Sequence, residues 1–104
     1  ALLHGEAVSA GMDMAFEFSA RLGLCPPQAS ETVRDHLTRL AMPTRKDVAP
    51  FLGDPDALLS HMRQDKKNAG GQITLILCRD IGQSFVDRTV DEGELLAYLK
   101  DIAT

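Results

Sequence analysis

The sequence predicts a mainly helical protein with one small β-hairpin, folded as one domain over residues 1–104. Apolar residues recur at the spacing of an amphipathic helix in four segments, and Pro, Gly or N-cap residues stand at the ends of these segments. Only one region, between residues 73 and 90, has the short β-branched apolar runs of paired strands. The length is that of a single domain.

The first helix is expected from about Gly5 to Leu22. Its charged residues share one face of the helical wheel: Glu6, Asp13, Glu17 and Arg21. Apolar residues fill the remaining broad arc. A helix with so much apolar circumference packs on several sides, so we expect a missing neighbour and an exposed patch that favours self-association.

A second helix and a loop are expected next. Gly23 ends the first helix as a C-terminal glycine does, and Pro26-Pro27 begins the second, where a missing N–H costs nothing. The apolar stripe continues to about Ala41, and Pro43 ends the helix. Prolines and a glycine within residues 43–53 favour a loop.

The last elements are a third helix, a hairpin and a fourth helix. Asp54-Pro55 is an N-cap followed by proline at the first helical position, and this helix should run to about Lys67. Residues 73–78 and 85–90 should pair across a turn that holds Asp80 and Gly82. Asp91 and Glu94 form a capping-box-like pair before the final helix.

Charge and apolar content exclude several classes of protein. The net charge of −4, with 11 basic residues spread thinly, argues against a nucleic-acid partner. No apolar run approaches the roughly 18 residues of a membrane span, and no signal peptide is visible. Cys25 and Cys78 lack a C-x-x-C pattern and are expected to be buried free thiols, which favours a reducing, cytoplasmic location.

His4 is the first candidate for chemistry. It begins a predicted helix, where the positive end of the helix dipole disfavours protonation of the imidazole, and a neutral imidazole is the form that binds zinc. The alternative is an exposed histidine with no ligand. A zinc site needs three or four protein ligands, and His36 and His61 have no ligand spacing to His4, so we expect packing or surface roles for these two.

Lys66 and Lys67 are the second candidates. They follow Asp65 at the end of the third predicted helix, where lysines commonly answer the negative end of the dipole. On the wheel, however, Lys66 falls beside the apolar arc and Lys67 points away from it. A lysine aimed into a cleft suits a phosphate group as a point charge, so Lys66 is the stronger candidate and Lys67 the second.

Together these segments resemble the 3-dehydroquinate synthases. The resemblance begins with Leu3–Met12 (LHGEAVSAGM) and Arg21–Leu24, and continues through Met42-Pro43 and Asp65–Asn68 to Ile81-Gly82. The first segment alone is shared with metal-dependent alcohol dehydrogenases. The later segments, in this order over nearly the whole chain, narrow the resemblance to the sugar-phosphate cyclases, and Asp-Lys-Lys favours dehydroquinate synthase among them.

The resemblance implies the multihelical C-terminal domain of the dehydroquinate synthase-like fold. It implies an NAD- and zinc- (or cobalt-) dependent enzyme, usually a homodimer, that converts 3-deoxy-D-arabino-heptulosonate 7-phosphate to 3-dehydroquinate and phosphate. His4 would be one metal ligand, and Lys66 or Lys67 would bind the substrate phosphate. We assign no catalytic residue and no NAD-binding residue to these 104 residues.

Departures from the family pattern predict an inactive fragment. The family's second histidine segment, its glutamate zinc ligand and its N-terminal NAD-binding domain are absent from this sequence. We therefore expect the isolated chain to bind neither NAD nor zinc well, and to need the N-terminal domain as a partner. The alternatives are another sugar-phosphate cyclase, an alcohol dehydrogenase relative, or a helical module without catalysis.

Overall fold

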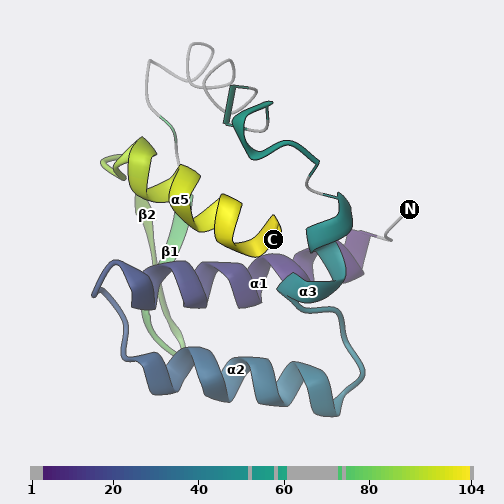
Figure 1. Cartoon of the computed structure of the whole chain (residues 1–104). Coiled ribbons are helices and arrows are strands. Elements are labelled where there is room, and N and C mark those ends of the chain that lie inside the picture. The colour runs from purple at the N-terminus through teal and green to yellow at the C-terminus, as the bar shows by residue number, and fades with distance from the viewer. Residues whose placement is uncertain (1–3, 52, 58, 61–72, 74, 104) are drawn as a thin grey trace.

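The fold is organised around helix α1, His4–Arg21, in the computed structural model. The structure describes residues 4–51, 53–57, 59–60, 73 and 75–103. In this part of the chain, helix α2 (Pro27–Arg39) runs beside α1 in the opposite direction (Figure 1). The short helix α3 (Arg45–Val48) and the 3₁₀ turn η1 (Ala49–Phe51) follow, then strands β1 (Leu75–Asp80) and β2 (Gln83–Asp87). Helix α5 (Glu92–Ala103) lies along α1 and closes the described chain.

Both long helices end in the same hydrogen-bonded turn. At the end of α1, the N–H of Leu24 donates to the carbonyl of Ser19, and Gly23 takes a φ of 77°. At the end of α2, the N–H of Met42 donates to the carbonyl of Leu37, and the left-handed position belongs to Ala41, with a φ of 55°. The predicted ends of these helices are confirmed to within two residues.

The loop predicted over residues 43–53 is wrong for residues 45–51, which form helical turns. Thr44 and Asp47 make a reciprocal capping box: the side chain of Thr44 accepts the N–H at the third helical position, and Asp47 accepts the N–H of Thr44 at 2.8 Å. The box starts α3, and Pro50 is accommodated in the 3₁₀ turn after it. The prolines of this segment therefore border or join helical turns. The sequence signal for α3 is the pair Thr44 and Asp47, spaced as in a capping box.

The third expected helix begins where the sequence indicates. Asp54 accepts the N–H of Asp56 at 3.0 Å as an N-cap does, and residues 55–57 and 59–60 are helical. The remainder of that prediction, to Lys67, lies outside the described residues. Asp91 likewise caps α5, since its carboxylate accepts the N–H of Gly93 at 2.8 Å.

The hairpin forms as predicted, but its strands are shifted. In the antiparallel register Ile76 faces Val86 and Leu77 faces Phe85, and Gly82 turns with a φ of 80°. β1 continues through Asp80, and β2 begins at Gln83, two residues before the predicted start. β1 packs on α1, so that the core lies between α1, β1 and α5. The buried members of this main core are Phe18, Leu59, Ile73, Leu77, Leu95, Tyr98 and Leu99.

Candidate functional site

The expected metal ligand occupies the first position of α1. His4 begins this helix of 18 residues. The structure does not describe the imidazole side chain of His4. His61, Lys66 and Lys67 lie wholly outside the described residues. His36 lies exposed on α2, which agrees with the surface role expected for it. Within the described ranges, no cluster of three His, Cys, Asp or Glu side chains could hold a metal ion.

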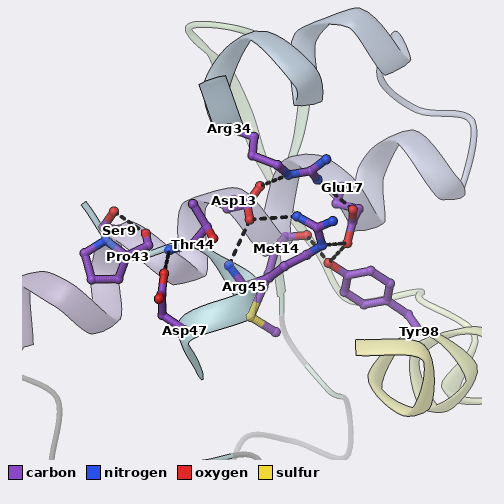
Figure 2. Close-up of polar contacts among 10 residues, drawn as sticks. All are labelled: Ser9, Asp13, Met14, Glu17, Arg34, Pro43, Thr44, Arg45, Asp47 and Tyr98. Carbon is purple, nitrogen blue, oxygen red and sulfur yellow. Dashed lines mark hydrogen bonds and ion pairs between the residues drawn. The ribbon is translucent and has the colours of Figure 1, made fainter. Parts of the chain in front are cut away.

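A buried carboxylate holds α1 against its neighbours. Asp13 lies nine residues after His4, and its side chain is 0% exposed. One carboxylate oxygen accepts the Nε–H of Arg34 from α2 at 3.1 Å, and the other accepts the backbone N–H of Arg45 from α3 at 2.9 Å (Figure 2). A buried charge is tolerated only when it is paired and hydrogen-bonded, and Asp13 meets both conditions.

Glu17 extends this network one turn further along α1. Its carboxylate contacts the guanidinium of Arg34 at 2.6 Å and that of Arg45 at 3.0 Å. The hydroxyl of Tyr98, from α5, donates to Glu17 at 2.8 Å (Figure 2). We call these five residues the α1 clamp: Asp13, Glu17, Arg34, Arg45 and Tyr98. The clamp joins α1, α2 and α3 through ion pairs, and it joins α5 through the hydroxyl of Tyr98.

Burial keeps the tyrosine of the clamp neutral. Burial, and then the hydrogen bond to Glu17, raise the pKa of Tyr98 well above its ordinary value of 10.0. The phenol therefore stays protonated at neutral pH and donates its hydrogen bond to Glu17. Its ring stacks on Phe18, with 5.1 Å between centroids, so the polar clamp continues directly into the main core.

The segment before α3 is also fixed on α1. The hydroxyl of Ser9 donates to the carbonyl of Pro43 at 2.8 Å, one turn from Asp13 (Figure 2). Together with the bond from Arg45 N–H to Asp13, this attaches both ends of the Pro43–Arg45 segment to two successive turns in the middle of α1. These two bonds and those of the α1 clamp together hold α1 in one rotation about its own axis.

Sequence reasoning grouped Asp13 and Glu17 as a polar helix face, but their partners were not visible. Arg34 and Arg45 stand 21 and 32 residues after Asp13, and nothing in local spacing pairs them. The only available signal was the position of the acidic residues on a helix that is apolar on its other faces. Such a polar stripe must meet either water or buried cations, and here it meets cations.

Cys25 and Cys78 are both free and buried, as expected. They share a second, smaller core with Phe16 and Ala29. Burial raises the pKa of both thiols, helped by the charge of Asp80 at Cys25 and by Cys25 at Cys78. Since the thiolate is the reactive form, neither thiol is activated for nucleophilic chemistry.

Both thiols should therefore react slowly with an aromatic disulfide reagent at neutral pH. We expect native rates at least about tenfold below those of the urea-unfolded chain, because folding both covers the thiols and disfavours the thiolate. Folding raises the pKa of both thiols above 9.0. The protonated thiols therefore contribute their full stability to the folded state below about pH 9, and this contribution is lost as the pH rises through the pKa values of the folded state. Equal rates in the two states would contradict the burial. The rate is read from the released thiolate's absorbance.

The comparisons with known proteins agree on one family. The family model described as 3-dehydroquinate synthase C-terminal matches residues 1–68, which is more than half of the chain. The chain belongs to this family. A 3-dehydroquinate synthase of Caulobacter vibrioides is 48% identical over 95% of the chain. Relatives of the same name from Rhizobium meliloti and Jannaschia sp. are 45% and 48% identical, each over 96% of the chain.

Family membership places the chain within a longer kind of protein. These 104 residues span 27% of the length of each of the three 3-dehydroquinate synthases. The fold predicted from the sequence pattern, mainly helical with one small hairpin, is confirmed. No described helix is long and apolar enough to cross a bilayer.

Proposed function

We propose that this chain is part of a 3-dehydroquinate synthase, which converts 3-deoxy-D-arabino-heptulosonate 7-phosphate to 3-dehydroquinate and phosphate. The observation that carries the proposal is the match of the C-terminal family model over residues 1–68. Relatives named for this activity, 43–48% identical over most of the chain, support it. We further propose a cytoplasmic location, which the free thiols support, and a homodimer, which rests on the family resemblance alone.

His4 is proposed as one ligand of a zinc or cobalt ion. The chemistry of the position fits, because an imidazole at the positive end of α1 is disfavoured as a cation and keeps a lone pair for the metal. Zinc takes three or four protein ligands, so His4 needs partners from elsewhere in the longer protein. When bound, the metal would polarise a hydroxyl group, and NAD would take up and return a hydride.

The α1 clamp is proposed to aim His4. It fixes the rotation of α1 through Asp13 and Glu17, and a rigid helix carries that rotation to its first residue. Lys66 is proposed to hold the substrate phosphate by its ammonium charge, with Lys67 as the second choice. Both lysines lie outside the described residues, so this assignment depends on the resemblance.

The test compares two histidine variants of the longer protein, cloned from the reading frame that contains this chain. The His4→Ala variant should lose its zinc, and its rate of phosphate release should fall by more than about 100-fold. Loss of a residue that only hydrogen-bonds a metal ligand commonly lowers metal affinity or activity 10–100-fold, and loss of a ligand itself should lower them further. His36→Ala is the matched control: this histidine is exposed on α2, and its loss should leave zinc content and turnover unchanged. The isolated chain should not release phosphate from the sugar phosphate.

Three results would overturn the proposal. The first is full zinc content and turnover in His4→Ala. The second is phosphate release from a different sugar phosphate but not from the heptulosonate, which would indicate another cyclase. The third is a reading frame that encodes no longer protein, which would indicate a helical module without catalysis.

A further inference from the structure

An apolar groove lies open between α1 and the hairpin. Its volume is about 470 Å³, and it is lined on one side by Val8, Gly11 and Met12 of α1 and on the other by Ile76 and Cys78 of β1. Val8 is 48% exposed, Met12 47% and Ile76 57%, which are high values for side chains of this kind. This groove is the exposed patch that the wide apolar arc of the first helix predicts, and we call it the α1–hairpin groove.

Gly11 lines the groove on the α1 side. It lies in the interior of the helix, where glycine is less favourable than alanine. A Cβ at this position would meet no other atom within 4 Å, so nothing in the described chain requires the side chain to be absent. A glycine at such a position allows a neighbouring element to approach the helix backbone closely.

The spacing on α1 indicates what kind of neighbour fits. Val8, Gly11, Met12 and Ala15 all line the groove, and their positions are those of one helix face. A row of this kind receives the side-chain ridge of another helix, and a glycine at the crossing lets the two axes come close. Asp80 stands on the wall at the turn end of the groove and favours a cation or an N–H donor there.

We propose that the α1–hairpin groove is filled by an apolar helix from the part of the longer protein outside these 104 residues. This inference rests on the proposed function, because it requires the longer chain. The relatives support that occupant: the matched region is 27% of their length, so most of each relative is available to cover the groove. A second copy of the chain is the competing occupant.

The experiment measures thermal midpoints of three variants in two contexts, the isolated chain and the longer protein. Met12→Asp should change the isolated chain little, since the side chain is half exposed, but lower the midpoint of the longer protein by about 5 °C or more, because an unpaired charge is then buried. Gly11→Ala should raise the midpoint of the isolated chain and lower that of the longer protein. Leu40→Asp, 57% exposed at the end of α2, is the matched control and should affect neither.

The opposite signs of Gly11→Ala in the two contexts are the decisive result. The inference is overturned if Met12→Asp and Gly11→Ala act equally in both contexts. It is also overturned if the isolated chain forms a dimer that Met12→Asp abolishes, while the same substitution leaves the thermal midpoint of the longer protein unchanged. The occupant of the groove is then a second copy of the chain. Phosphate release by the unmodified longer protein is measured separately, so a failure of the proposed activity leaves the midpoint result interpretable.

Discussion

Replacing Asp13 with asparagine should lower the free energy of unfolding of the isolated chain by about 3 kcal/mol. Breaking a buried ion pair typically costs about 3–5 kcal/mol, and the low end applies because both arginines keep Glu17 and some contact with water. Both carboxylate oxygens of Asp13 accept N–H groups, at 3.1 and 2.9 Å. An asparagine offers only one acceptor, and its NH₂ group must face a donor.

Asp35 provides the matched control for this substitution. It is exposed on α2, and Asp35→Asn should change the free energy of unfolding by less than about 0.5 kcal/mol, as surface substitutions usually do. Urea titrations followed by circular dichroism measure both variants. Equal midpoints for the two variants would show that the α1 clamp contributes no net stability, as is found for some buried ion pairs.

Replacing Leu77 with alanine should cost about 3 kcal/mol, within the roughly 2–5 kcal/mol of buried leucine truncations. Leu77 is 2% exposed at the centre of the main core, so the shortened side chain leaves a cavity between α1, β1 and α5. For a domain of this size, that is a large share of the total stability, which is typically about 5–15 kcal/mol.

Ile76 is the neighbouring control in the same strand. It is 57% exposed on the opposite face, so Ile76→Ala in the isolated chain should cost less than about 1 kcal/mol, mainly through its lost contact with Val86. Urea midpoints again give the comparison. A larger loss for Ile76→Ala than for Leu77→Ala would mean that β1 presents its other face to the core, which a register slip of one residue would produce.

The long helices could be predicted because their signals are local. Gly23 and Pro27 end and begin helices through their own backbone preferences, and the structure agrees at both positions. The predicted strands differ from the observed ones by two or three residues at each end, because apolar content indicates the strands whereas pairing through Asp80 and Gln83 decides their ends. Helix α3 differs from the predicted loop because proline indicates a loop by its own backbone preference, whereas Thr44 and Asp47 cap a short helix between Pro43 and Pro50.

The residues of the candidate site also differ in whether local sequence could predict them. His4 could be placed at the start of a helix from sequence, and its proposed role as a metal ligand depends on the resemblance. The α1 clamp could not be predicted, because Asp13 meets its cations only after α2 and α3 have folded back along α1. A helical wheel gives the direction of a side chain, but the neighbour that it meets depends on the path of the chain elsewhere.

The small hydroxyl of Ser19 has a consequence for solubility. Ser19 is 0% exposed, donates to the carbonyl of Ala15 at 2.6 Å and accepts the N–H of Cys78 at 2.9 Å. That N–H belongs to a strand of a two-stranded sheet, where unpaired backbone groups invite pairing with foreign strands and the growth of fibrils. By occupying the N–H of Cys78, a helix side chain removes one attachment point for aggregation from the middle of β1.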